Sequence, residues 1–534
     1  MKRKLFALGA AALTMTMLAG CAGGNDGTDE GAAAEPEFAV DGHLNLVIGS
    51  DAGDWHPLIS STAVSQRVNY LTSDRLFWIE PTGELSPWIA TEWTEEPDSL
   101  TFTVRDGVTC SDGTPFTAET VARNLEFVID PANASAWNET LVPANATVSV
   151  EGDTVTLRTP EPRGFLAFNL GMLNLVCDAA LDDPDAYRTK SAGTGMFVLT
   201  DYAPGESLTL ERRDDYAWAP DDTTAQTPGV PKTLTIRIVP DPSTQANLLL
   251  SGDVNAGLVE GPDEARLLAA GLDYRENVNS PEAIFFNQVE GLPTADLAVR
   301  EAFIQALDLD VLAQVMLEGE GVRATSNMTV TPRACEFDSV TGNLPAFDAD
   351  AAASTLDRGG WKLGSDGTRQ KDGQRLQIDL LYVNSTDAMS AAAEMVAAEW
   401  QKLGAEVNMA GGDYTWIVGQ VWTPDDLSGW GATLGVRANY NTPSVSVPLF
   451  SGSPPPAGIN FASVSNDAFA QKAAEAYAIP GVDSCAVWRE AEAALITDVD
   501  FVPIASSPIR LYLNGASQTI DDNALQGFTL RALQ

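Results

Sequence analysis

Histidine is nearly absent from this chain of 534 residues, which contains only His43 and His56. Zinc hydrolase chemistry and a Ser-His-Asp triad both need a positioned imidazole, and no GxSxG, HExxH or P-loop motif occurs. Paired carboxylates can cleave glycosides, but no spacing here singles out such a pair. We therefore expect a protein that is not an enzyme and has no cofactor and no metal site. A surface hydrolase is the weaker alternative.

Cationic residues are also scarce. The chain has 31 Lys and Arg against 74 Asp and Glu, which gives a formal net charge of −43. Nucleic-acid phosphates need cationic contacts, so this balance argues against a nucleic-acid partner. We interpret the acidic surface chiefly as solubilising, with a field that gathers cationic ligands as the alternative.

Long apolar runs are missing as well. Leu5 to Leu18 follows the basic Lys2-Arg3-Lys4 and is too short to remain as a membrane span, and no later stretch is apolar enough to span. The run ends in Leu18-Ala19-Gly20-Cys21, which resembles a bacterial lipobox. This resemblance implies that residues 1–21 are a lipoprotein signal peptide ending in the lipidated Cys21. An ordinary secretion signal is the alternative. Residues 22–40 have no apolar period and predict a flexible tether.

The most informative segment runs from Phe102 to Phe127, FTVRDGVTCSDGTPFTAETVARNLEF. A short extended stretch is interrupted by the turn signal Arg105-Asp106-Gly107, and a second turn follows at Asp112-Gly113-Thr114-Pro115. Thr117 is placed to cap the next helix. The apolar residues that recur at helical spacing in it are Val121, Leu125 and Val128. The segment therefore predicts a strand, two turns and a helix.

The order of these elements resembles the signature of the family 5 solute-binding proteins, the extracytoplasmic receptors of peptide- and nickel-type ABC importers. The family pattern R-x-G-V, then DG-T-P-hydrophobic-T-A-x-D-V, is matched from Arg105 to Val121, with Thr120 in place of the usual Asp. Later segments resemble the family in the same order. Two of them are Gly193-Thr194-Gly195-Met196-Phe197 and Asp500-Phe501-Val502-Pro503-Ile504.

The resemblance implies an α/β fold with two lobes, of the periplasmic-binding-protein-like type II, and an extra subdomain on the first lobe. Within a solute-binding domain of residues 41–534, lobe I is expected at about 41–77, 193–285 and 500–534. The extra subdomain is expected at about 78–192, and lobe II at about 286–499. In lobe II, Val299, Phe303, Leu307 and Val311 are predicted to share one helix face.

Four cysteines follow Cys21, and an even number in an exported chain suggests disulfides with three possible connectivities. We favour Cys110–Cys177 and Cys335–Cys485, because each pair falls within one of the implied subdomains. Buried free thiols are the alternative. No CxxC or Cys/His cluster points to a structural metal.

The resemblance also implies a ligand held between the lobes by hinge closure. The segment from Gly429 to Leu434 resembles the family's W-x-A-D-Y strand, which in peptide binders pairs with the ligand backbone while its Asp takes the α-amino group. The predicted ligand-binding residues are therefore Trp430, Gly431, Ala432 and Thr433, with Thr433 in the place of that Asp. Either another acid replaces it, or the ligand lacks a free amine. The candidate acids are Asp51, Asp54, Asp425 and Asp426, each of which is otherwise a solvated loop carboxylate.

Aromatic residues cluster near this strand and supply flat contact area. Tyr414, Trp416 and, in the first loop, Trp55 are predicted to contact the ligand, with Trp422 and Tyr440 as weaker candidates. Core packing is the alternative for each of them. Arg437 could meet a carboxylate, and His56 could line the cleft, although a structural loop histidine is the better interpretation.

These features together predict a lipid-anchored, extracytoplasmic substrate-binding component of an ABC importer. It is expected to act as a monomer and to deliver a small solute to a permease and ATPase complex. Peptides rank first as ligands, followed by sugars or other organic solutes and by a nickel chelate. A ligand sensor without transport is the alternative of another class.

Overall fold

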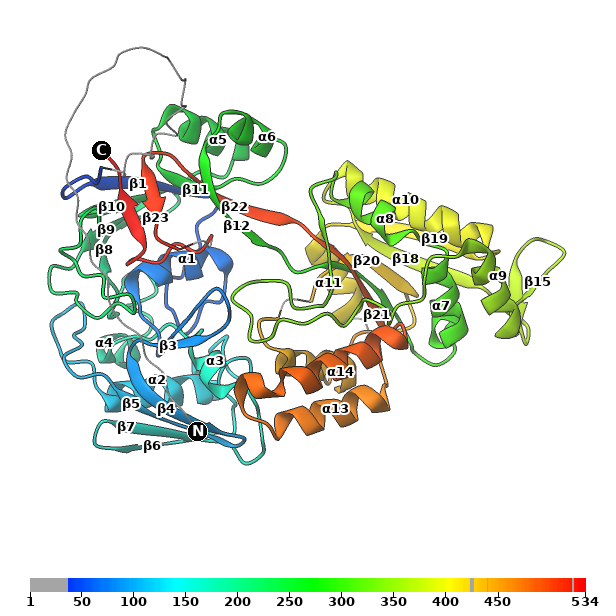
Figure 1. The fold of residues 1–534 in the computed structure, drawn as a ribbon, viewed down its shortest axis with the longest axis horizontal. Helices are drawn as coiled ribbons and strands as arrows, with labels where there is room; N and C mark the ends of the chain where they lie inside the picture. Colours follow the sequence, from blue (N-terminus) through cyan, green and yellow to red (C-terminus); the bar gives the residue numbers. More distant parts are fainter. Residues whose placement is uncertain (1–36, 423–426, 439, 521–522) are drawn as a thin grey trace, which may run out of the picture. The chain divides into compact units, whose positions relative to one another are not determined.

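The computed structural model describes residues 37–422, 427–438, 440–520 and 523–534 (Figure 1). The predicted signal peptide, Cys21, tether residues 22–36, Asp425 and Asp426 lie outside these ranges. Phe38 and Ala39 fall within the predicted tether, yet they pair with the end of the chain. Phe38 bridges Leu533, and the Ala39 amide donates to the Ala532 carbonyl at 2.9 Å.

The first sheet has seven strands among the described residues, in the order β12-β22-β11-β1-β10-β9-β8. Its centre is β1, which pairs in parallel with both β10 and β11. The alternating Leu44 and Leu46 of β1 are buried. The strands are β1 (His43–Ile48), β8 (Phe197–Ala203), β9 (Ser207–Arg212), β10 (Thr233–Ile238), β11 (Ala256–Leu258), β12 (Asp273–Val278) and β22 (Pro508–Leu513).

The second sheet has six strands in the part of the chain that is described, in the order β14-β21-β13-β20-β18-β19. Three of them, β13, β20 and β21, are buried at every residue, as their mainly apolar sequences favour. The strands are β13 (Glu282–Phe286), β14 (Val322–Arg323), β18 (Gln377–Val383), β19 (Glu406–Gly412), β20 (Ala432–Val436) and β21 (Phe501–Ser506).

The chain crosses between these sheets twice. β12 leads through residues 279–281 into β13, and β21 leads through Ser507 into β22. The sequence-based boundaries near 285 and 500 would put β13 and β21 with the first lobe, whereas both strands pair within the second sheet. The apolar pattern alone could not show which sheet a fully buried strand would join.

A third, four-stranded antiparallel sheet in the order β4-β5-β7-β6 carries the signature segment. Gly107 and Gly113 adopt positive φ in its two turns, and the Thr117 hydroxyl caps α2 (Ala118–Ile129) by accepting from the Thr120 amide. Val121, Leu125 and Val128 are fully buried, so the predicted helix face is confirmed. The strands are β4 (Ala90–Glu96), β5 (Ser99–Val104), β6 (Thr147–Glu151) and β7 (Thr154–Arg158).

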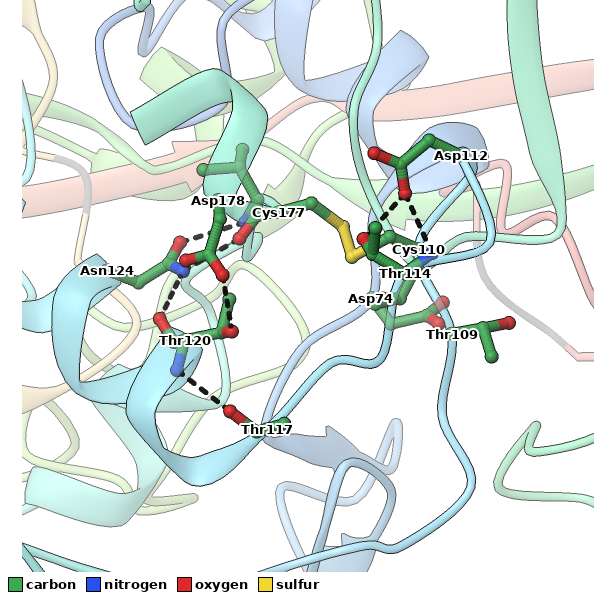
Figure 2. The surroundings of a disulfide bond; sticks show 12 residues. Asp74, Thr109, Cys110, Asp112, Thr114, Thr117, Thr120, Asn124, Cys177 and Asp178 are labelled. Atoms are coloured by element: carbon green, nitrogen blue, oxygen red, sulfur yellow. Dashed lines mark hydrogen bonds between the residues drawn. A yellow bond between two sulfur atoms is a disulfide. The ribbon is translucent and has the colours of Figure 1, made fainter. Parts of the chain in front are cut away.

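A disulfide joins the signature segment to the chain before β8 (Figure 2). It links Cys110 to Cys177, while the Asn124 side chain accepts from the Val176 amide at 2.8 Å. Thr120, at the position where the resemblance places an Asp, donates its hydroxyl to Asp178 at 3.2 Å. A second disulfide links Cys335 to Cys485, so the described cysteines pair as the sequence favoured.

The remaining elements complete the framework around these sheets. The longer helices are α1 (Ala63–Thr72), α5 (Pro242–Ser251), α7 (Leu297–Gln305), α8 (Leu309–Met316), α9 (Ala349–Arg358), α10 (Asp387–Lys402), α11 (Tyr414–Trp422), α13 (Asp467–Tyr477) and α14 (Cys485–Thr497). The short helices are α3 (Leu166–Leu170), α4 (Asp178–Asp182), α6 (Glu264–Ala269) and α12 (Val447–Ser451). The short strands are β2 (Phe77–Ile79), β3 (Leu85–Pro87), β15 (Lys362–Leu363), β16 (Arg369–Lys371), β17 (Gln374–Arg375), β23 (Ala516–Gln518) and β24 (Leu530–Ala532).

One predicted helix is two helices. α7 ends at Gln305, and the Asp308 side chain starts α8 by accepting from the Asp310 and Val311 amides at 3.1 Å. Val299, Phe303 and Leu307 are buried as predicted, but Val311 is 44% exposed. The break changes the helical phase, so the prediction for Val311 was wrong.

Glu492 on α14 is a buried acid that holds the loop before α9. It accepts hydrogen bonds from the Asn327 amide at 2.8 Å and from the Ser339 hydroxyl at 2.6 Å. Burial raises the pKa of Glu492 to about 7, although both hydrogen bonds oppose this shift. The loop is therefore held by a group that titrates near neutral pH.

We expect stability to decrease as pH rises through this range. The pKa of Glu492 is about 7 in the folded state against an ordinary value of 4.5, so between these values the folded state binds more protons than the unfolded state. Between pH 5 and pH 8 the free energy of unfolding should fall by ~3 kcal/mol less in Glu492→Gln than in wild type. Urea denaturation at several pH values measures this difference. Glu490→Gln, at an exposed position of the same helix, should keep the wild-type slope. Equal slopes for wild type and Glu492→Gln would contradict the assignment.

Candidate functional site: an uncharged cavity

A cavity of about 190 Å³ lies between helices α1 and α3 and two loops. One wall comes from α1 and α3, a second from the loop between α2 and β6, and a third from the chain after β20. The described residues that line it are Gln66, Tyr70, Trp137, Thr140, Leu141, Asn169, Met172, Tyr440, Asn441, Thr442 and Val445.

Several lining side chains are held in place by hydrogen bonds. Gln66 donates to the Ser60 carbonyl at 2.8 Å and accepts from Asn174 at 2.7 Å, so both ends of its amide are used. The Trp137 indole donates to the Pro57 carbonyl at 2.7 Å. These contacts fix the walls before any ligand arrives.

The wall after β20 is fastened in the same way. Asn441 donates its side-chain amide to the Pro332 carbonyl at 2.8 Å, and its own carbonyl accepts from the Ala334 amide at 2.8 Å. Across the cavity, the Thr442 hydroxyl donates to Asn169 Oδ1 at 3.4 Å. This long hydrogen bond joins the chain after β20 to α3.

None of the described residues that line the cavity carries a formal charge. Burial raises the pKa of Tyr440, so its hydroxyl stays neutral over the physiological range. Two described cations lie next to the lining: Arg67 neighbours Gln66 on α1, and the Arg75 guanidinium lies over the ring of Tyr70, 5.0 Å from its centroid. Burial lowers the pKa of Arg67, while the charge of Glu260 opposes this shift. The site can therefore offer hydrogen bonds and flat apolar contact without formal charge.

The strand predicted to bind ligand lies in the core of the second sheet. Trp430 is 1% exposed and packs on Phe461 at 5.9 Å between ring centroids, and Thr433 is 0% exposed. Ala432 and Thr433 pair with β13 on one side and β18 on the other. Gly431 donates its amide to the Asp379 carbonyl at 2.8 Å.

Both edges of β20 are therefore occupied by neighbouring strands at Ala432 and Thr433, which leaves no free edge there for backbone pairing with a ligand. Side-chain contact by Trp430 or Thr433 stays a prediction. Their Nε1 and Oγ1 atoms are buried without a hydrogen-bond partner among the described residues.

The candidates from the first loop are engaged in local structure. Asp54 forms an ion pair with Arg188 and accepts from the His56 amide at 3.0 Å. Trp55 is 2% exposed and meets Tyr202 edge to face. His56 is fully buried against Phe127, and burial lowers its pKa. None of these residues lines the cavity, and ligand contact by Trp55 and Asp54 stays a prediction.

Tyr414 and Trp416 start α11 and are 40% and 37% exposed. The Tyr414 hydroxyl donates to the Arg437 carbonyl at 3.0 Å. The Arg437 guanidinium pairs with buried Glu282 at 2.8 Å, so it already has a carboxylate partner. Neither aromatic residue lines the cavity, and their ligand contact also stays a prediction.

Among the sequence candidates that the structure describes, Tyr440 is the one placed on the cavity wall. The other lining residues come from α1, from α3 and the turn after it, and from two loops, and they form no motif. The aromatic span from Tyr414 to Tyr440 was the available signal, and its last member lies on the wall of this candidate cavity.

Within the described residues, no group of three or more His, Cys, Asp or Glu side chains is placed to hold a metal ion. Over the same residues, no helix combines the length and the apolar character needed to cross a membrane.

Comparison with known proteins places the chain in a family. Residues 84–462 match the family described as bacterial extracellular solute-binding proteins, family 5 Middle. The match spans well over half of the chain, so the protein belongs to the family 5 extracellular solute-binding proteins.

Two curated relatives align with nearly two thirds of this chain. The chain is 29% identical over 350 residues to the nickel-binding periplasmic protein of Escherichia coli strain K12, covering 62% of this chain and 63% of that protein. It is 30% identical over 350 residues to protein XP55 of Streptomyces lividans, covering 63% of this chain and 60% of that protein. Each alignment spans less than two thirds of the relative's length.

Solved structures share the fold. A substrate-binding protein from Microbacterium hydrocarbonoxydans, solved with 4-hydroxybenzoate hydrazide, superposes with a TM-score of 0.68 at 26% identity, covering 92% of this chain and 99% of that one. The Listeria monocytogenes substrate-binding protein CtaP gives a TM-score of 0.77 at 16% identity, covering 93% of this chain and 100% of that one. The fold is thus that of the two-lobed α/β solute-binding proteins.

The burial of Trp430 predicts a structural role that can be measured. Trp430→Ala should lower the free energy of unfolding by ~3–5 kcal/mol, because it removes a large side chain from a packed core. Trp416→Ala, at a partly exposed position of similar chemistry, should cost less than ~1 kcal/mol. Urea denaturation followed by circular dichroism measures both. A small loss for Trp430→Ala would contradict the structural role.

Proposed function

We propose that this protein is a lipid-anchored, extracytoplasmic receptor of an ABC importer that captures peptides or a related small solute and delivers them to a permease. The observation that carries this proposal is the cavity between α1, α3 and the chain after β20. α1 follows β1 of the first sheet, and the third wall follows β20 of the second sheet. A bound solute would therefore contact segments attached to both sheets at once.

Family membership and the names of the relatives support a binding role. The relatives and neighbours include proteins named for nickel, oligopeptide and glutathione binding, and one solved with a nonapeptide. These names span several ligand classes. The relatives therefore support a receptor role for this chain but not one particular ligand. The ligand class has to be inferred from the residues that line the cavity.

Closure is proposed to occur at the crossings. Residues 279–281 and Ser507 link the two sheets, and the Asn279 side chain donates to the Ser507 hydroxyl at 3.1 Å. Hinge residues are commonly a few positions at the ends of elements that absorb the change in backbone angle. A solute that contacts both cavity walls would favour the closed state by its differential affinity.

The receptor proposal is tested by mass spectrometry of the mature chain purified in detergent, under native and denaturing conditions. We expect one or more small solutes that remain bound in the native spectrum and are released on denaturation. Tyr440→Ala should deplete them at least tenfold, because the ring forms part of the cavity wall. A native chain that never carries a solute, and binds none from a peptide and metabolite library, would contradict the proposal.

Anchoring is tested separately at Cys21. Cys21→Ser removes the thiol that would carry the lipid, so the protein should move from the membrane fraction to the soluble fraction, measured by fractionation and immunoblot. Ser111→Ala, in the folded part, serves as a control for expression and should leave the protein with the membrane. Retention of Cys21→Ser in the membrane fraction would defeat the lipoprotein assignment.

A further inference from the structure

We infer that the cavity binds an uncharged solute that carries an amide group beside a flat ring, rather than a peptide with free ends or a metal chelate. This inference rests on the proposed receptor function. Aromatic carboxamides and hydrazides belong to this class, and so do cyclic dipeptides, which have amides but no terminal charges.

The first reason is the absence of formal charge from the lining formed by the described residues. Moving a charged group from water into a closed protein site costs several kcal/mol unless a counter-charge or a dense set of hydrogen bonds replaces the water. A linear peptide has both an ammonium and a carboxylate, so it would meet this cost twice. An uncharged amide would meet neither.

The second reason is that acids near the predicted site are already engaged. Thr433, which stands where the family resemblance places an amine-binding Asp, is buried in β20 and offers no negative charge. Asp54 pairs with Arg188, and Asp51 accepts from the Tyr202 hydroxyl at 2.8 Å. Among the described acids proposed as replacements, none lines the cavity.

The third reason is the set of hydrogen-bonding groups left over on the walls. Asn441 uses its amide nitrogen on Pro332, and its Oδ1 makes no hydrogen bond with a described residue. Asn169 receives the Thr442 hydroxyl at its Oδ1, and its Nδ2 makes no such bond. One free acceptor and one free donor on facing walls match the N–H and C=O of a single amide group.

The fourth reason is shape. The rings of Tyr70, Trp137 and Tyr440 lie on the lining, and tyrosine and tryptophan rings pack well against flat apolar faces. A volume of about 190 Å³ suits a one-ring compound and is too small for an extended oligopeptide. The lining therefore suits a ligand that has both a flat ring and an amide group.

Isothermal titration calorimetry of the ligand-free mature chain in detergent tests the inference with four probes. They are 4-hydroxybenzoate hydrazide, cyclo(Gly-Phe), linear Gly-Phe, and Ni²⁺ with histidine. We expect at least one uncharged probe to bind ten times or more tightly than both charged ones. Its Kd should change less than twofold between 50 and 500 mM salt, because no ion pair is formed.

Variants of the cavity sharpen this test. Asn169→Leu should weaken the uncharged probe five- to thirtyfold through loss of one hydrogen bond to the ligand. Asn169→Asp should weaken it as well and improve the linear dipeptide, since it adds the missing negative charge. Arg67→Gln should leave the Kd of the uncharged probe unchanged, because an uncharged ligand has no carboxylate for the guanidinium. Circular dichroism should show that all three variants fold.

The outcomes separate the inference from the receptor proposal. Tighter binding of linear Gly-Phe or of the nickel chelate would overturn the inference and leave the receptor proposal standing, as would a strong effect of Arg67→Gln. If none of the four probes binds, the charge of the solute found by native mass spectrometry decides the inference. If no solute is found either, both proposals fail.

Discussion

Two antiparallel strand pairs, placed end to end, are the constraint on which the rest of the structure depends. β12 pairs with β22 in the first sheet, and the same two chain segments continue as β13 and β21, which pair in the second. The linkers between them are also tied, since the Asn279 amide donates to the Ser507 carbonyl at 2.8 Å. Because both crossings run together, bending there breaks few hydrogen bonds, whereas bending inside either sheet would break a ladder. The sheets can therefore change their angle as units while each keeps its core.

The cavity wall after β20 depends on a second set of contacts, which are remote in sequence. Asn441 is held on both sides by the segment from Pro332 to Ala334, and the next residue, Cys335, is joined to Cys485 on α14. The Tyr477 hydroxyl donates to the Ser444 carbonyl at 2.9 Å and fixes the far end of the same wall. A wall held in this way loses little conformational freedom when a ligand binds, so less of the interaction energy is spent on ordering it.

The sequence predicted the parts of the fold that have a local physical cause. Thr117 caps α2 because its hydroxyl accepts from a backbone amide in the first turn of the helix, and Gly107 and Gly113 take positive φ in the two predicted turns. Val311 was misplaced because a single Asp308 side chain restarts the helix, which periodicity does not record. The site was harder to predict, because the sequence of β20 does not show whether its edges pair with a ligand or with two neighbouring strands. Asn169 and Asn441, far apart in sequence and in no motif, become neighbours of one cavity only through the fold.

The surface charge attracts cations from a distance, whereas the cavity lining selects a ligand by direct contact. A net charge of −43 gathers cations around the surface, but at physiological ionic strength such fields decay over about 8 Å. A charge that enters the cavity gives up part of its hydration shell, so the nearest groups decide what remains bound. Those groups are amides, hydroxyls and rings. An ammonium drawn to the surface would lose its water on entry and find no carboxylate on the lining, since Asp54 and Glu282 are neutralised by Arg188 and Arg437. The strongly acidic exterior therefore does not imply a cationic ligand.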